Sequence, residues 1–500
     1  MLTNRSSGIL LHPSSLPGPF GSGDFGADAY RFVDWLQGAG QRCWQLLPLG
    51  EIGPGNSPYM SNSAFAGNIF MIDLADLAEQ GWLGQEDLIP HPDFQVARVD
   101  YTLIKKFRTE RLRRAAKVFF ATFDAQLLRT DYEIFCQEES YWLEDYALFR
   151  TLEDKHQGCG WSHWSDGFPS RESLALQHIA ASCTDDMNYW KFCQWSFMRQ
   201  WLKLKKYAAQ RGIIMIGDVP IFVAYQSADV WANQALFELD ETGHPTVVAG
   251  VPPDYFSATG QLWGNPLYRW NMHEQTGYAW WVSRMRHALK LFDVVRIDHF
   301  RGFASYWEIP ACAPTAMHGR WVAGPGEKLF KACKQALGEL PIIAEDLGVI
   351  TPDVEELRDK FGLPGMRVLQ FAFGEDESNY FLPHHYIPNA VAYSGTHDND
   401  TTIGWWEALI PQQREFVQRY LASDGQEIHW DMIKALSRSS ANTVISSMQD
   451  VLGLSGDHRM NYPGQALGNW EWRFSWSQLL PEQTRRLAQL SDENGRIVAS

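Results

Sequence analysis

Short apolar runs that end at a carboxylate recur along this chain. The runs at 213–218, 294–298, 341–346 and 391–398 lead to Asp218, Asp298, Glu345 and Asp398. A near-continuous stretch of Val and Ile is typical of a strand buried on both faces, as in a parallel sheet covered by helices. Because acids are unsuited to such an interior, we expect them where each strand emerges at its C-terminal end.

Further apolar runs bring the total to eight. They cover residues 8–12, 43–48, 368–373 and 443–448. Helical patterns fill several of the gaps, such as 353–360 and 411–420. Eight strands in series with intervening helices predict a (β/α)8 barrel, the TIM-barrel fold, in which the C-terminal ends of the strands carry the chemistry.

Two long stretches interrupt this pattern. Residues from about 85 to 190 show charged, aromatic-rich helical patterns, which predict a mainly helical insertion; a separate domain is the alternative, but no Pro-, Ser- or Gly-rich linker borders it. A second insertion, at about 225–285, carries a Gly-, Pro- and aromatic-rich loop at 250–266 that we expect to cover the cleft. Residues 1–500 then form one catalytic barrel, and the roughly 50 residues after the eighth run leave no room for a C-terminal β-sandwich.

Charge and composition narrow the class of ligand. The chain has 43 Lys and Arg against 59 Asp and Glu, a formal net charge of −16. We expect no nucleic-acid partner and no membrane partner, since no basic surplus exists to neutralise phosphates. Aromatic residues make up 14% of the chain, and many lie in Gly/Pro/Asn-rich stretches that favour a cleft for flat ligands. Sugars and nucleobases both fit such a cleft, and the charge favours sugars.

Other features of the composition indicate a cytoplasmic enzyme. Residues 1–8 lack a basic segment followed by an apolar stretch, so no secretory signal is expected. No apolar run approaches the roughly 18 residues that a membrane span requires. The 7 cysteines are scattered and form no Cys-x-x-Cys pair, which argues against a disulfide framework and a zinc site. We expect reduced thiols, no metal and no cofactor.

The acids at the predicted barrel mouth suit the chemistry of the glycosidic bond, which requires one ionised and one protonated carboxyl group. Arg296 and Asp298 lie two apart on one strand and share a face, so the guanidinium is expected to keep Asp298 ionised as a nucleophile. Glu345 follows an apolar run, where burial should raise its pKa as a general acid requires. For any single acid, helix capping or pairing with an arginine explains the position equally well; for all four together it does not.

Histidines and aromatic residues flank these acids. His299 and His397 adjoin predicted strand-end acids, where a neutral imidazole can donate to a sugar hydroxyl. A zinc site would need three or more ligands with open geometry, which makes it the weaker interpretation. Trp263 and Tyr59 lie among Gly and Pro residues, so stacking against a ligand is favoured over a place in the core.

These motifs resemble the four signature regions of the α-amylase clan, in the version found in the amylomaltase or 4-α-glucanotransferase group, glycoside hydrolase family 77. The resemblance rests on IGDVP at 216–220, RIDHF at 296–300, AEDLG at 344–348 and GTHDN at 395–399, together with segments at 11–17, 57–68 and 250–266. It is collinear from residue 8 to about 475 and is weakest in the insertion at 85–190.

The resemblance implies a retaining transglycosylase that transfers a segment of a 1,4-α-D-glucan or maltooligosaccharide to the 4-hydroxyl of glucose or another glucan. Asp298 would be the nucleophile that forms a covalent glucosyl-enzyme, Glu345 the acid/base, and Asp398 the residue that stabilises the transition state. The substrate-binding residues would be Tyr59, Asp218, Arg296, His299, His397, Trp263, Asn265, Asp254 and Tyr255. Two alternatives remain: an α-glucan hydrolase of the same clan, and a catalytically silent glucan-binding protein.

Overall fold

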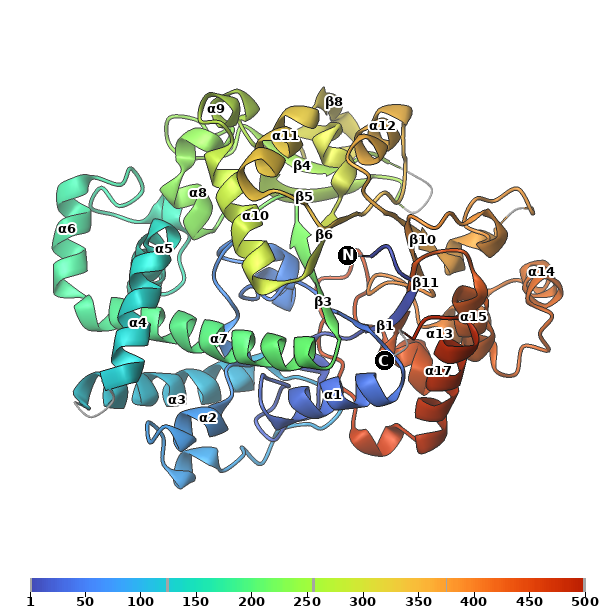
Figure 1. Cartoon of the computed structure of the whole chain (residues 1–500). Coiled ribbons are helices and arrows are strands. Elements are labelled where there is room, and N and C mark those ends of the chain that lie inside the picture. Colours follow the sequence, from blue (N-terminus) through green and yellow to red (C-terminus); the bar gives the residue numbers. More distant parts are fainter. Residues whose placement is uncertain (1, 123–125, 254–256, 375, 498–500) are drawn as a thin grey trace.

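A closed barrel of parallel strands forms the centre of the computed structural model, which describes residues 2–122, 126–253, 257–374 and 376–497. The strands pair in chain order and the last one pairs with the first (Figure 1). They are β1 (Ser6–Leu10), β2 (Cys43–Gln45), β3 (Ile214–Pro220), β6 (Val294–Asp298), β9 (Ile342–Ala344), β10 (Gly365–Val368), β11 (Ala390–Tyr393) and β12 (Thr443–Ser447). The predicted (β/α)8 barrel is confirmed.

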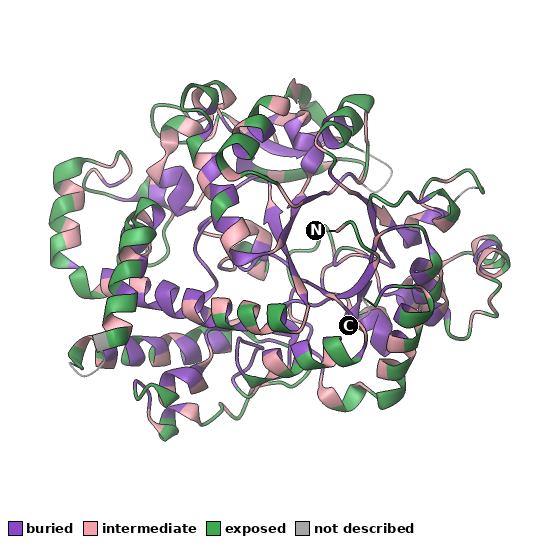
Figure 2. Cartoon of the chain, viewed as in Figure 1, coloured by how far each residue is buried: buried purple, intermediate pink, exposed green. Residues whose placement is uncertain are grey.

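Burial on both faces explains why these segments form barrel strands. Every residue of β1, β2, β9, β11 and β12 is buried. Such strands lie between the barrel interior and a layer of helices, which their Val- and Ile-rich runs require. Figure 2 shows buried residues along the barrel and exposed residues on the outer helices.

The sixth barrel strand differs from the prediction. The sequence pattern placed it at 368–373, but β10 ends at Val368, and Leu369–Phe373 form a 3-10 helix. The strand starts earlier because Gly365 pairs with both neighbouring strands. Only glycine permits this close approach, since a Cβ there would lie 2.3 Å from Asp346 Oδ2. The predicted apolar run instead supplies a second hydrophobic cluster.

Helices surround the barrel, and those between β2 and β3 group to one side of it (Figure 1). Helix α1 (Ala27–Gly38) lies between β1 and β2 in the chain. The group between β2 and β3 comprises α2 (Leu74–Glu79), α3 (Tyr101–Ala121), α4 (Gln126–Glu138), α5 (Ser140–Lys155), α6 (Ser173–Ser182) and α7 (Thr184–Gln210). The others are α8 (Ala228–Ala232), α9 (Trp270–Gln275), α10 (Ala279–Leu291), α11 (Glu327–Leu337), α12 (Pro352–Lys360), α13 (Thr402–Ala408), α14 (Pro411–Leu421), α15 (Ile428–Arg438), α16 (Met448–Leu452) and α17 (Pro481–Glu493). Across the described ranges, none of the helices is long and apolar enough to cross a membrane.

A second, antiparallel sheet lies beside the barrel in the order β5–β4–β7–β8 and was not predicted. Its strands are β4 (Val247–Val251), β5 (Gln261–Pro266), β7 (Ser305–Pro310) and β8 (Arg320–Ala323). The first two precede β6 and the last two follow it, so two excursions of the chain meet in one sheet. The segment at 225–285, expected as an insertion, therefore contributes strands as well as helices.

Candidate active site

The predicted acids lie at the C-terminal ends of barrel strands. Asp218 lies within the last three residues of β3, Asp298 is the last residue of β6, and Glu345 directly follows β9. Asp398 lies on the loop that follows β11. Because the barrel strands are parallel, these ends open on one face of the barrel, where catalytic residues of this fold gather.

A buried guanidinium links Asp218 to Asp298. Arg296 Nη1 donates to both carboxylate oxygens of Asp218, at 2.8 and 2.6 Å, and Arg296 Nη2 lies 3.0 Å from Asp298 Oδ1. The Tyr59 hydroxyl also donates to Asp218, at 2.8 Å. Burial lowers the pKa of Arg296, but the two acids outweigh it and raise that pKa well above its ordinary value. Arg296 therefore stays charged and holds both carboxylates in place.

Burial sets the protonation of the two acids that a retaining reaction would use. It raises the pKa of Asp298 to about 6, although Arg296 opposes the rise. It also raises the pKa of Glu345 to about 7, where Arg296 again opposes the rise and the charge of Asp298 adds to it. At neutral pH Asp298 is thus mainly ionised. Its pKa is nevertheless higher than the adjacent guanidinium alone would predict, because burial raises it. The two acids titrate as a pair, and the proton resides mainly on Glu345.

Two backbone N–H groups fix the carboxyl group of Glu345. His299 N–H donates to Oε2 at 2.7 Å, and Leu347 N–H donates to Oε1 at 3.0 Å. His299 has a φ of 54°, in the left-handed region. Non-glycine residues with this conformation are uncommon and cluster at functional sites. The turn after β6 therefore places Asp298 and the N–H group that contacts Glu345 on successive residues.

The pKa values of the two histidines shift in opposite directions. Burial lowers the pKa of His397, but Asp398, whose Oδ2 lies 3.3 Å from Nε2, outweighs this and raises it. Burial and the charge of Arg301 lower the pKa of His299 to about 3, so its ring is neutral. Burial also acts to raise the pKa of Asp398, yet its neighbours, His397 foremost, hold that pKa well below its ordinary value. Asp398 is therefore a permanent anion at the barrel mouth.

Aromatic rings stand on two sides of these groups. Tyr59 stacks on His397 with ring centroids 5.1 Å apart and an interplanar angle of 18°. Trp263 on β5 meets His299 edge-on, with centroids 4.8 Å apart. Asn265 is buried, and its amide donates at 2.8 Å to a backbone carbonyl, which anchors the strand that carries Trp263.

The two remaining predicted binding residues, Asp254 and Tyr255, lie outside the described residues. The other predicted binding residues lie around the barrel mouth as described above. The amide nitrogen of Asn265 donates to a backbone carbonyl of the protein itself. The acid that follows Glu345 has a structural role, in line with the alternative that a strand-end carboxylate pairs with an arginine. Asp346 is buried and accepts a 2.5 Å hydrogen bond from Arg358.

Three residues beside the acids escaped the sequence analysis. Asn461 Nδ2 donates to Asp398 Oδ1 at 2.6 Å, and Arg459 Nη2 donates to the backbone oxygen of Asp398 at 2.9 Å. The ring of Trp470 lies 5.6 Å from that of Tyr59. All three belong to a loop with no hydrophobic periodicity. The sequence signal that could have identified this loop is its content of tryptophan, at 470, 472 and 476.

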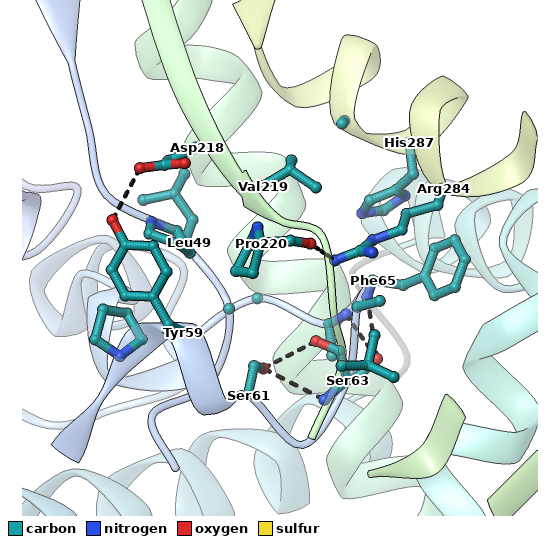
Figure 3. A pocket seen from close by; sticks show the side chains of 18 of the residues that line it. Leu49, Tyr59, Ser61, Ser63, Phe65, Asp218, Val219, Pro220, Arg284 and His287 are labelled. Carbon is teal, nitrogen blue, oxygen red and sulfur yellow. Dashed lines mark hydrogen bonds between the residues drawn. The ribbon is translucent and has the colours of Figure 1, made fainter. Parts of the chain in front are cut away.

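Two pockets adjoin these residues. The larger, of about 650 Å³, is lined in part by Tyr59 and Asp218. Figure 3 shows this hydrogen-bonded pair on one side of β3 and His287 and Arg284 on the other. A second pocket, of about 420 Å³, reaches His397. Within the described ranges, no group of three or more His, Cys, Asp or Glu side chains is placed to hold a metal ion.

Known proteins match this chain along almost its whole length. The profile of the Glyco_hydro_77 family, described as 4-alpha-glucanotransferase, matches residues 11–479. The 4-alpha-glucanotransferase of Thermus thermophilus is 49% identical over 501 residues, covering 99% of each chain. The chloroplastic/amyloplastic 4-alpha-glucanotransferase of Solanum tuberosum is 44% identical over 99% of this chain and 87% of its own. The amylomaltase from Streptococcus agalactiae, solved in complex with acarbose, is 38% identical with a TM-score of 0.95 over 98% of this chain and 99% of that one. The chain therefore belongs to glycoside hydrolase family 77, the family of the 4-alpha-glucanotransferases.

Proposed function

We propose that this protein is a retaining 4-α-glucanotransferase that moves a segment of a 1,4-α-glucan to the 4-hydroxyl of glucose or a maltooligosaccharide. The observation that carries the proposal concerns Asp298 and Glu345: the N–H group of the residue after Asp298 donates to Glu345, and the pKa of Glu345 lies above that of Asp298. A retaining reaction needs one ionised nucleophile and one protonated acid. Membership of the family supports the same assignment.

In the first half of the reaction, Glu345 donates its proton to the glycosidic oxygen while the Asp298 carboxylate attacks the anomeric carbon. The bond between that carbon and the oxygen breaks, and the leaving chain departs with the proton. The segment to be transferred is then a β-linked ester on Asp298. Asp398 stays ionised and stabilises the positive charge that develops on the sugar ring.

In the second half, the ionised Glu345 takes the proton of the acceptor 4-hydroxyl, whose oxygen attacks the anomeric carbon and displaces Asp298. Two inversions restore the α-configuration, and Glu345 regains its proton. Water at roughly 55 M would resolve the same ester by hydrolysis, so transfer requires an acceptor held in position. We assign this role to Trp263 and to the segment 250–266, which we propose covers the cleft.

Incubation with maltotriose tests the proposal. A glucanotransferase is expected to yield glucose together with a ladder of longer oligomers, which size separation resolves. A hydrolase of the same clan would give only smaller sugars, and a silent glucan-binding protein would leave maltotriose unchanged. The matched control is Asp298→Asn, which keeps the side-chain volume and removes the nucleophile.

A further inference from the structure

A loop distant in sequence contacts Asp398 through both its side chain and its backbone. Asn461 Nδ2 donates to Asp398 Oδ1 at 2.6 Å, and Arg459 Nη2 donates to the Asp398 backbone oxygen at 2.9 Å. The Asp398 side chain is 49% exposed, so packing alone does not fix its rotamer. We propose that Asn461 is a positioning residue that holds the Asp398 carboxylate toward the sugar ring in the transition state. The inference rests on the proposed function and adds a residue to it.

Arg459 in turn fixes Asn461. Its Nε donates to the Asn461 backbone oxygen at 3.2 Å. Its guanidinium lies 4.7 Å from the ring centroid of Tyr462, and its Nη1 lies 3.9 Å from Asp400 Oδ2. Arg459 therefore fixes the backbone from which the Asn461 side chain reaches Asp398.

The loop that carries these donors has its own internal supports. Tyr462 N–H donates to Asn469 Oδ1 at 2.7 Å, and the Tyr462 hydroxyl donates to the Gly456 backbone oxygen at 2.9 Å. Trp470 N–H donates to the Met460 backbone oxygen at 2.7 Å. Trp470 has a φ of 66°, a strained conformation for a bulky residue that persists only where the surroundings impose it. The donors are therefore ordered before any sugar arrives.

The contacts leave Asp398 free to bind a sugar. Asn461 occupies one position on Oδ1, and His397 Nε2 lies 3.3 Å from Oδ2. Each carboxylate oxygen can accept two hydrogen bonds, so each still has room for a ring hydroxyl. A donor at 2.6 Å to an ionised acceptor is a strong hydrogen bond, which restrains the carboxylate plane. Asn461 thus aims Asp398 without competing with the substrate.

The first test compares Asn461→Ala with Asn469→Ala in maltotriose turnover. Loss of alignment is expected to lower kcat by about tenfold or more in Asn461→Ala, with KM changed by less than about threefold. Asn469→Ala loosens the same loop and leaves the Asn461 amide in place, so it is expected to retain most of the kcat. An unchanged kcat in Asn461→Ala would overturn the proposal, since the hydrogen bond from the amide would then not be needed to align Asp398. An equal loss in Asn469→Ala would overturn it as well, because loop order rather than the hydrogen bond would matter.

The second test uses Asn461→Asp, whose side chain has nearly the same shape. When protonated, a carboxyl group at 461 donates to Asp398 as the amide does; when both groups are ionised they repel each other and the alignment is lost. The ratio of this variant's kcat to that of the unmodified protein is therefore expected to fall as pH rises. The other groups that face Asp398 stay unchanged; they are His397, Arg296, Asp298, Tyr59 and Arg459.

A pH profile of unmodified shape in Asn461→Asp would refute the positioning role, even if the alanine variant fails to fold. Both tests read the ratio of variant to unmodified rate. If the unmodified protein hydrolysed maltotriose instead of extending it, the proposed function would fail, yet the same ratios would still decide the role of Asn461.

Discussion

Replacing Arg296 with methionine removes the cation that joins two carboxylates at the barrel mouth. The Arg296 side chain is 4% exposed, and it lies 2.6 Å from Asp218 and 3.0 Å from Asp298. Methionine keeps much of the volume, so the change is mainly one of charge. Removal of one partner from a buried ion pair typically costs about 3–5 kcal/mol, because the remaining charge is left without compensation. We expect a loss of this size in the free energy of unfolding.

The expected shift in melting temperature follows from chain length. Unfolding entropy is about 2.1 cal/mol/K per residue, which for 500 residues gives about 1 kcal/mol/K. The loss therefore lowers Tm by about 3–5 °C. It also depends on pH. Without Arg296, which opposes the effect of burial, the pKa of Asp298 rises further in the folded state. The native protein then binds more protons than the unfolded chain, and stability falls as pH rises by up to about 1.4 kcal/mol per pH unit for each proton.

Differential scanning calorimetry near pH 5.5 and pH 8 measures this effect. Arg296→Met is expected to lose more stability at the higher pH, where both acids must ionise without a partner. Combining Arg296→Met with Asp218→Asn removes one of the stranded charges, so the double variant should melt above the single one. An equal loss at both pH values, or a double variant less stable than Arg296→Met, would show that packing rather than charge determines the outcome.

Other predictions concern activity. Asp298→Asn is expected to lower maltotriose turnover by roughly 10⁴-fold or more with an unchanged circular dichroism spectrum, since the nucleophile is lost and the shape is kept. Tyr59→Phe deletes the donor 2.8 Å from Asp218 and is expected to lower kcat/KM by about 5–30-fold, equivalent to about 1–2 kcal/mol. Trp263→Ala is expected to shift products from longer oligomers to hydrolysis, measured by chromatography. The pH profile of kcat/KM is expected to rise through about 6 as Asp298 ionises and to fall above about 7 as Glu345 loses its proton.

Each of these has a control or a contrary result. Tyr393→Phe removes a similar hydroxyl, 2.9 Å from Gln45 in the barrel interior, and should leave kcat/KM largely unchanged. Trp321→Ala removes an indole that is 41% exposed on β8 and should not alter the ratio of transfer to hydrolysis. If Trp263→Ala kept the ratio of transfer to hydrolysis of the unmodified protein, the result would argue against binding of the acceptor sugar at the Trp263 ring. A flat rate between pH 5 and 8 would contradict the assigned protonation of the acid pair.

The barrel was predictable because its strands leave a local signal. In β6, Val294, Val295 and Ile297 are all buried, which is what an uninterrupted apolar run indicates. The strand β10 was misplaced because it begins at Gly365, whose place in the sheet depends on close contact with Asp346 rather than on hydrophobicity. Pairings between distant segments leave no such local trace.

The small antiparallel sheet shows the same limit. Its strand β5 contains Gly264 and Pro266, residues that indicate a loop when read from sequence alone. It becomes a strand only because β4 pairs with it, and β4 in turn pairs with β7, which follows the fourth barrel strand, β6. Composition marked the segment as a loop near the cleft but did not reveal these partners.

Sequence reasoning located the acids and missed what orients them. Asp298 and Glu345 follow strands whose direction is fixed by the barrel, so their meeting point follows from topology. The position of Asn461 follows from contacts with Arg459 and from a left-handed residue at Trp470, which arise only once the chain has folded. Residues that bind a ligand or carry charge are thus easier to find from sequence than the residues that orient them.

Burial, together with the neighbouring charges, explains why one acid at the barrel mouth keeps a proton. Four carboxyl groups, those of Asp218, Asp298, Glu345 and Asp398, lie near the guanidinium of Arg296 and the imidazole of His397, whose pKa Asp398 raises against the effect of burial. Burial disfavours the charged form of Glu345 and the negative charge of Asp298 adds to this effect, although Arg296 opposes it, so the pKa of Glu345 rises to about 7. Arg296 contacts two of the acids and His397 a third, whereas the Glu345 carboxyl group is held by backbone N–H groups. The proton therefore resides mainly on Glu345 and Asp298 is mainly ionised, as the proposed roles of acid and nucleophile require.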